Sequence, residues 1–377
     1  MKRNVTKMQG GWHLVLALAA PLLLLGTGCD PNPNTPPDAG VGDAGTDAGI
    51  PCSDLAHDAK LGTLRLEPGF TVAESVAIPS SLVAVTAITH GNSYKLYGLR
   101  TSDKTVQTLG TWPTVAVDNA PPVFVLAEED RNETTFLGGY LTNDGTRVLT
   151  GYTKMGTGFP GNVLVYDTVT PANSTRLSAP GNFSAAAVPG TFFINGTGLG
   201  PATGPAVYAL RAQNQSYVMN TLATFPSTTA ASGYTAVSTN NVAVFGYSVY
   251  PKNTLHAVPP SEYTAALSSG TPFALAGWPE VYSGEDLFGA AGFSSGVVLH
   301  RGSYDPETFA PLTKDVVRRE LTVGGSNSQT VAVGALTPVL TAVNTCTQVD
   351  TLAPMGEDLL VGVSDENGHR LVRLQKQ

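Results

Sequence analysis

Short runs in which apolar and polar residues alternate recur along the chain from about residue 60 onward. These runs are rich in β-branched side chains, and clear examples lie at 81–88, 122–128, 162–169, 241–249 and 295–301. Alternation with a period of two over four to eight residues is typical of β-strands. Turn sequences with Gly, Asn or Pro separate the runs, as at 143–145, 199–204 and 366–368,. The pattern therefore predicts an all-β fold.

Helical patterns are scarce. Only the stretch 306–321 has a spacing that could form one or two helical turns, and Pro311 interrupts it,. The composition agrees with many short strands and tight turns, because the 377 residues include 41 Gly and 27 Pro,. Charged residues make up 13% of the chain, about half the usual share,.

One strand pattern repeats, with a Tyr or His placed between aliphatic residues. Its copies centre on Tyr97, Tyr166, Tyr208, His256 and His300, and the last three steps are 42, 48 and 44 residues. The first step is longer, at 69 residues, and the segment 284–292 recurs at 356–364 after a step of 72. A period in the low to middle forties, filled by about four short strands, indicates the blades of a β-propeller.

The repeat predicts the number of blades less firmly than the fold. Dividing about 310 residues by about 45 gives seven blades, and six or eight stay open. This count interprets the two long steps as each hiding a second, eroded blade. The segments 184–190, 232–238 and 288–294 are candidates for inner strands facing the central channel, and they are small and neutral. A tandem pair of β-sandwiches is the alternative architecture, which explains the composition but not the repeat.

The charge balance excludes one class of partner. The chain is acidic, with a formal net charge of −8 from 21 Lys and Arg and 29 Asp and Glu. A chain of this kind repels phosphate backbones, so we expect no nucleic-acid binding. It offers no electrostatic attraction to anionic lipid either, so membrane attachment needs another cause.

The first 28 residues have the layout of a secretory signal peptide. Lys2, Arg3 and Lys7 form a positive start, residues 12–25 are apolar, and a small-residue patch precedes Cys29,. The apolar run is too short for an ordinary membrane-spanning helix.

The segment LLGTGC, residues 24–29, resembles the lipobox of bacterial lipoproteins, in which small residues precede a cysteine that is lipidated and becomes the new N-terminus. The sequence departs from that family at Gly26, where Leu is usual. The resemblance implies acyl chains on Cys29 and a location in the cell envelope, at the outer membrane or the periplasmic face of the inner membrane. An ordinary cleaved signal peptide, with Cys29 as a bystander, is the alternative.

We predict that residues 29–51 form a disordered tether between Cys29 and the folded domain, which we place at 52–377. The segment is rich in Pro, Asp, Ala and Gly, contains the triplet DAG three times and has no aromatic residue,. It is similar in composition to tethers of envelope lipoproteins from myxobacteria-like bacteria. An exported compartment permits disulfides, so Cys52 and Cys346 are candidates for a bridge between the start and the last part of the domain. Two free buried thiols are the alternative.

Two short motifs match catalytic or cofactor patterns, but their context favours turns. Residues 156–161 fit G-x-G-x-x-G, yet a strand follows where a nucleotide-binding helix should begin,. Residues 292–296 fit G-x-S-x-G around Ser294, and again a strand follows instead of the helix of a nucleophile elbow,. We therefore expect no bound cofactor and interpret 292–296 as a hairpin turn.

The remaining candidates for chemistry are histidines and one acidic run. No two of the histidines beyond the leader have a metal-binding spacing; they are His57, His90, His256, His300 and His369,. We interpret His256 and His300 as packing residues and expect no metal site. The acidic run 127–133 reads as a solvated turn between strands, and no residue is assigned a catalytic role,.

The leading hypothesis is a non-enzymatic, lipid-anchored envelope protein that uses a β-propeller for binding or scaffolding a protein or glycan. The small, neutral inner strands favour this role over catalysis. The first alternative is an envelope hydrolase or lyase that acts on polysaccharide or peptide in the propeller channel. The second is a structural partner of an outer-membrane machine.

Overall fold

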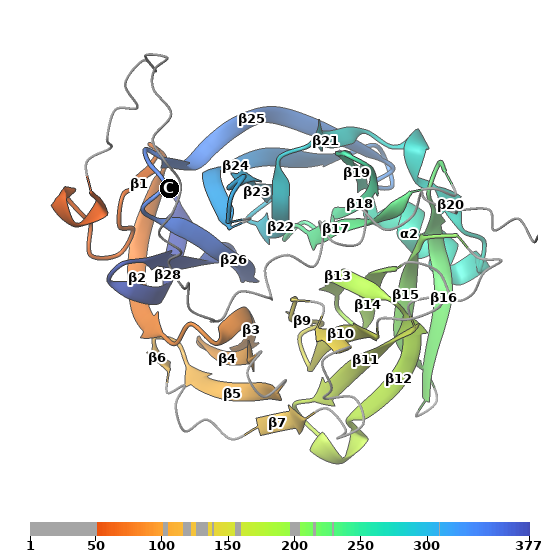
Figure 1. Cartoon of the computed structure of the whole chain (residues 1–377). Coiled ribbons are helices and arrows are strands. Elements are labelled where there is room, and N and C mark those ends of the chain that lie inside the picture. The colour runs from red at the N-terminus through yellow and green to blue at the C-terminus, as the bar shows by residue number, and fades with distance from the viewer. Residues whose placement is uncertain are drawn as a thin grey trace, which may run out of the picture.

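Six sheets are arranged radially around a central axis in the computed structural model, and their strands pair antiparallel except for a short parallel pairing in one sheet (Figure 1). This is a β-propeller, so the predicted fold is confirmed and tandem β-sandwiches are excluded. The structure describes residues 51–100, 105–115, 122–125, 135–137, 139–154, 160–196, 204–213, 216–227, 230–308 and 310–377.

Blades 1 to 3 follow one another along the chain, each beginning with its inner strand. Blade 1 contains β3 (Leu82–His90), β4 (Ser93–Arg100), β5 (Thr105–Thr111), β6 (Thr114–Val115) and β7 (Pro122–Val125). Blade 2 contains β8 (Thr135–Leu137), β9 (Thr142–Asn143), β10 (Arg147–Lys154), β11 (Pro160–Asp167) and β12 (Thr175–Pro180). Blade 3 contains β13 (Asn182–Val188), β14 (Thr191–Gly196), β15 (Ala206–Gln213), β16 (Ser216–Thr224) and β20 (Phe273–Ala274).

Blades 4 to 6 complete the ring. Blade 4 contains β17 (Ala231–Val237), β18 (Ala243–Val249), β19 (Lys252–Val258) and β21 (Glu280–Gly284). Blade 5 contains β22 (Leu287–Phe293), β23 (Gly296–Tyr304), β24 (Pro311–Gly324), β25 (Thr330–Ala342) and β1 (Leu64–Leu66). Blade 6 contains β26 (Gln348–Met355), β27 (Asp358–Asp365), β28 (Gly368–Lys376) and β2 (Phe70–Ile78). The helices among the described residues are α2 (Pro260–Ser269) and the 3-10 turns η2 (Cys52–Asp54), η4 (Pro171–Asn173) and η5 (Leu275–Gly277).

The two ends of the chain close the ring. The N-terminal strand β2 pairs with the C-terminal strand β28, from Phe70 opposite Lys376 to Ile78 opposite His369. The short strand β1 adds to the outer edge of blade 5 by pairing with β25. The C-terminus accordingly lies beside β1 and β2 in Figure 1. This closure pairs the outer edge of β28 with β2, so that the backbone groups of β28 on that side are hydrogen-bonded,.

The core is divided among the spaces between neighbouring blades. The described residues form six hydrophobic clusters, and each lies between two adjacent sheets. The cluster between blades 5 and 6, for example, packs Phe293 and Val316 against Val361 and Leu374. A single sheet cannot cover both of its faces, so each blade depends on its two neighbours for burial.

The prediction of seven blades is wrong, and six, which the sequence left open, is confirmed. The repeated pattern marks different strands in different blades. We count the strands of each blade outward from the central axis. Tyr97 lies in β4, the second strand of blade 1, whereas Tyr166 lies in β11, the third strand of blade 2. The step of 69 residues therefore spans one blade and one further strand. The step of 72 likewise leads from the start of β22 to β27, so neither step hides an eroded blade.

The position of the helix is also a correction. The stretch 306–321 lies mostly in β24, a strand of 14 residues, while α2 forms at Pro260–Ser269. The signals for α2 were present, because Pro260 begins it and Gly270 ends it with a left-handed φ of 72°,. The described part of the chain has no helix with the length and apolar composition needed to cross a membrane.

Close packing between the inner strands of blades 4 and 5 depends on Gly292. A Cβ atom at this position would collide with the backbone carbonyl of Val237 in β17. We expect Gly292→Ala to lower the free energy of unfolding by about 1–3 kcal/mol, as overpacking does. Urea denaturation measures this loss, with Gly289→Ala as the control variant. The new Cβ atom at position 289 would contact only the His300 Cβ, at 3.9 Å. Equal midpoints for the two variants would contradict this account.

Candidate functional site

The described residues place the inner strands around one central cavity of about 190 Å³. Every blade contributes to its lining, and the contributing segments lie in or beside β3, β9, β13, β17, β22 and β26. The predicted inner-strand segments at 184–190, 232–238 and 288–294 lie largely within β13, β17 and β22. We call the end of the ring at which the inner strands begin the top face.

Most of the cavity wall is small and neutral. Runs of Ala and Gly occur at 185–187 and 289–292, and aromatic rings come from Phe183, Tyr234 and Phe288. Tyr140 also lines the wall and donates its hydroxyl to Asn182 Oδ1 at 2.5 Å. Burial raises the pKa of Tyr140 and of Tyr234, so both phenols stay neutral,. The wall therefore offers apolar and aromatic surface with little charge.

Asp350 is the exception among the described lining residues, because it carries the single carboxylate. It lies where the register between β26 and β27 shifts, between Val349 and Thr351, so it is the extra residue of a β-bulge,. The Ser364 hydroxyl donates to Asp350 Oδ1 at 2.8 Å, and His369 Nδ1 lies 3.4 Å from Oδ2. Burial raises the pKa of Asp350 above its ordinary value, although 37% of the side chain stays exposed at the cavity mouth.

A buried histidine, His300, also lines the cavity. Burial lowers the pKa of His300 to about 4, so the ring is neutral at pH 7,. Its Nε2 lies 3.1 Å from Thr313 Oγ1, and the Val349 amide donates to that same oxygen at 2.8 Å. The Phe288 ring contacts His300 at a centroid distance of 5.4 Å and Tyr304 at 4.8 Å.

We call Phe288, His300, Asp350 and His369 the Asp350 sector. Phe288, His300 and Asp350 line the same cavity, and Thr313 joins His300 of blade 5 to the backbone of Val349, the residue before Asp350 in blade 6. Sequence reasoning missed Asp350, although an acidic residue in an inner strand of otherwise apolar character was a usable signal. A lone carboxylate can hold a cation or accept hydrogen bonds, whereas glycoside hydrolysis uses a facing pair.

The predicted disulfide between Cys52 and Cys346 is confirmed, with the two Cα atoms 5.5 Å apart. Cys346 lies between β25 and β26, in the connection that leads into an inner strand, so the bridge lies at the top face. Cys29 lies outside the described residues. The bridge therefore fixes the start of the described chain to the face at which the inner strands begin.

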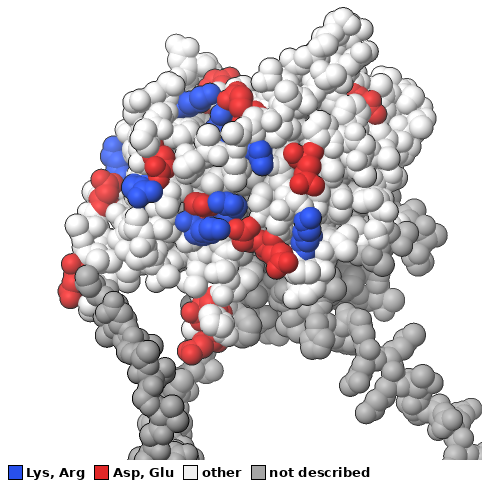
Figure 2. Space-filling view, turned by 90° about the horizontal axis from the view of Figure 1, so that it is seen from above, with Lys and Arg blue, Asp and Glu red and all other residues white. Residues whose placement is uncertain are grey.

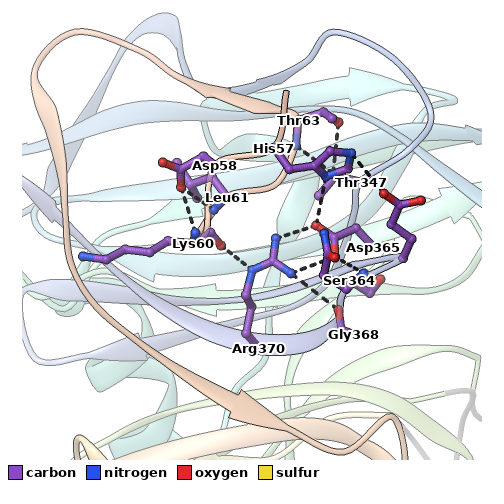
Figure 3. Close-up of polar contacts among 12 residues, drawn as sticks. His57, Asp58, Lys60, Leu61, Thr63, Thr347, Ser364, Asp365, Gly368 and Arg370 are labelled. Carbon is purple, nitrogen blue, oxygen red and sulfur yellow. Dashed lines mark hydrogen bonds and ion pairs between the residues drawn. The ribbon is translucent and has the colours of Figure 1, made fainter. Parts of the chain in front are cut away.

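A polar network continues from the bridge, and we call it the N-terminal clasp: residues 52–63 with Thr347, Asp365 and Arg370 (Figure 3). Arg370 forms a bidentate pair with Asp365, at 2.7 and 3.0 Å, and donates from Nε to the Lys60 carbonyl at 2.6 Å. The Thr63 amide donates to Thr347 Oγ1 at 2.8 Å. These contacts are internal to the protein, so the clasp joins chain ends and offers no evident ligand site.

The remaining sequence candidates lie elsewhere. Ser294 forms the turn between β22 and β23 with a φ of 54°, as the predicted hairpin requires. His256 is buried, contacts the Trp278 carbonyl at 2.7 Å and stacks on Tyr247, in agreement with packing. The acidic run 127–133 and residues 156–159 of the glycine motif lie outside the described residues. Within the described part of the chain, no three His, Cys, Asp or Glu side chains gather in a metal-binding arrangement.

Charged side chains of both signs are interspersed on one side of the ring (Figure 2). Figure 2 shows one side of the ring, where Lys and Arg lie among Asp and Glu and neither sign dominates. Several of the charges described pair across strands, as in Arg301 with Asp315 at 2.6 Å and Lys314 with Asp286 at 3.5 Å. This side of the molecule offers no continuous basic surface for a polyanion.

Comparison with solved structures supports the fold at very low sequence identity. A putative oxidoreductase (glucose dehydrogenase) from Thermus thermophilus is 10% identical, with 81% of this chain and 100% of that chain covered and a TM-score of 0.50. An oligogalacturonate lyase in complex with manganese is 11% identical, with 74% and 73% covered and a TM-score of 0.40. Prolyl oligopeptidase B from Galerina marginata is 8% identical, with 75% and 38% covered and a TM-score of 0.40. No protein-family model and no curated protein sequence matches the chain.

Proposed function

We propose that the protein is a lipid-anchored binding protein of the bacterial cell envelope, with acyl chains on Cys29 and a ligand held at the mouth of the propeller cavity. The observation that carries the binding role is the cavity itself, which all six blades build and line with small, aromatic and neutral side chains. A concave, mostly apolar wall with a few polar groups is the usual form of a ligand site.

The polar groups of the cavity support binding rather than catalysis. Acid–base hydrolysis by paired carboxylates needs two groups that face each other across the substrate, and the described lining residues supply one,. His300 is neutral and hydrogen-bonded to Thr313, so it is already engaged inside the protein. The single carboxylate suits recognition of a ligand group.

The proposal of a lipid anchor is based on the sequence at 24–29. The position of Cys52 indicates on which face of the propeller this anchor would lie. The tether at 29–51 ends at Cys52, which the disulfide fixes to the top face. A tether of this length has a reach of roughly 25 Å as a flexible coil. The proposed anchor and the cavity mouth would then belong to the same face of the propeller.

Replacing the proposed lipidation site tests the anchor. We expect the natural protein to sediment with membranes until detergent is added, and Cys29→Ser to appear in the soluble fraction, because acyl chains supply the attachment. The matched control is the double variant Cys52→Ser/Cys346→Ser, which should stay with the membranes. Protease added to intact cells then distinguishes protein exposed on the cell surface, which is cleaved, from protein in the periplasm, which is protected. Soluble natural protein, or a membrane-bound Cys29→Ser variant, would contradict the proposal.

A further inference from the structure

We propose that the Asp350 sector binds a ligand through an alkylammonium group, with the Asp350 carboxylate as its counter-ion and the neighbouring rings as its apolar wall. This inference rests on the proposed binding function, and it names the chemical class of the ligand. The sector lies at the mouth of the cavity described above, on the side where blades 5 and 6 meet.

The carboxylate is held in place before any ligand arrives. Ser364 from β27 and His369 from β28 contact its two oxygens, at 2.8 and 3.4 Å, so both neighbours fix the direction of the side chain. The bulge in β26 places the residue outside the regular alternation of the strand,. The side chain nevertheless keeps 37% exposure, which leaves the carboxylate open to an entering group.

This arrangement has an energetic consequence for the empty protein. Burial raises the pKa of Asp350, which means that the surroundings disfavour the charged form,. The hydrogen bond from Ser364 and the contact with His369 offset burial only in part. A positively charged ammonium group beside the Asp350 carboxylate would stabilise its charged form.

The Phe288 ring fits the aliphatic part of such a ligand, because it lines the same cavity as Asp350. The Tyr304 ring packs against Phe288 at a centroid distance of 4.8 Å and supports it from outside the cavity. Aromatic faces attract cations as well as alkyl chains. None of the described lining residues is Lys or Arg, so no basic side chain among them favours an anionic ligand.

A divalent metal ion fits the sector less well than an amine. Calcium and magnesium take several oxygen ligands, commonly from more than one carboxylate, and the described residues gather no such set around Asp350,. A neutral polyol would use the hydrogen bonds of the site but would bring no positive charge to the Asp350 carboxylate. A single ammonium group matches the single carboxylate.

Titration calorimetry with simple probes at pH 7.5 tests the inference on the purified full-length protein in detergent. The probes are cadaverine, Nα-acetyl-lysine N-methylamide and the neutral analogue 1,5-pentanediol. We expect both amines to bind at least tenfold more tightly than the diol, and Asp350→Asn to remove that preference. Tighter binding of the lysine derivative would assign the amine to a peptide, and tighter binding of cadaverine to a free polyamine.

Two further variants separate recognition from folding and from net charge. Glu307→Gln removes an exposed negative charge from the turn between β23 and β24, at the same face, and should leave amine binding unchanged. Asp350→Asn should keep or slightly raise the melting temperature, because it removes a carboxylate that burial disfavours,. Phe288→Leu keeps apolar area without the ring and should weaken amine binding several-fold.

Three results would overturn the inference. These are the absence of amine binding to the natural protein, amine binding that Asp350→Asn leaves intact, and equal binding of the diol. Diol binding that survives Asp350→Asn would remove the amine class and leave a binding role for the cavity. Because membrane fractionation of Cys29→Ser is a separate measurement, failure of the anchor can be told from failure of the amine site.

Discussion

Arg370→Met is expected to lower the free energy of unfolding by about 3–5 kcal/mol, the cost of leaving one partner of a buried ion pair alone. The Asp365 side chain has 0% exposure and the Arg370 side chain 10%, and two hydrogen bonds join them. The substitution also removes the bond from Arg370 Nε to the Lys60 carbonyl, which holds the N-terminal clasp against blade 6. Equilibrium denaturation in guanidinium chloride measures the loss.

A matched variant and a double variant make the comparison decisive. Arg65→Met breaks an ion pair with Glu67 in which the arginine is 62% exposed, so we expect a loss below about 1 kcal/mol,. Asp365→Asn combined with Arg370→Met should recover part of the loss, because no charge is then left buried without a partner. Equal losses in the two single variants would show that burial of the pair contributes little.

The same pair predicts a dependence on pH. Burial by itself would raise the pKa of Asp365, but hydrogen bonds from Arg370 and the Asn367 amide, with the charge of Arg370, outweigh it and lower the pKa. A lowered pKa gives stability that is present above the unfolded value of about 3.9 and is lost as the pH falls through the folded value. Arg370→Met should therefore reduce this part of the acid sensitivity, while the Asn367 amide and His57 still contact Asp365.

The fold could be predicted because its determinants are local. Alternation identifies strands, and recurrence of a buried strand every forty to fifty residues indicates blades. The number of blades could not be read from the same pattern. The second and third strands of a blade are both covered by neighbouring sheets, so Tyr97 in β4 and Tyr166 in β11 have similar local sequences. Only strand pairing tells the two positions apart.

The candidate site depended on contacts that are distant in the sequence. The direction of Asp350 follows from a register shift, and its partners Ser364 and His369 come from the next hairpin. The polar clasp joins Thr63 to Thr347, which lie 284 residues apart. The disulfide was the exception, because the sequence has three cysteines and the predicted lipidation of Cys29 leaves Cys52 and Cys346 as the single possible pair,.

Removing that disulfide with Cys52→Ser/Cys346→Ser should lower the free energy of unfolding by about 2–4 kcal/mol. The bridge joins residues 294 positions apart, so it restricts nearly the whole unfolded chain. The ring itself should stay closed, because the ladder between β2 and β28 does not include either cysteine. We therefore expect the circular dichroism spectrum of the folded β-propeller to be unchanged at 25 °C.

Local opening of the N-terminal clasp is the more specific readout of the bridge. Without it, residues 52–63 are held by side-chain and turn hydrogen bonds alone, and these break more easily than a strand ladder,. Trypsin should then cleave after Lys60 at least tenfold faster, while β2 and the rest of blade 6 resist. The natural protein under reducing conditions should behave like the double variant, and Cys29→Ser should not. Unchanged cleavage after Lys60 would mean that the polar contacts alone hold the clasp.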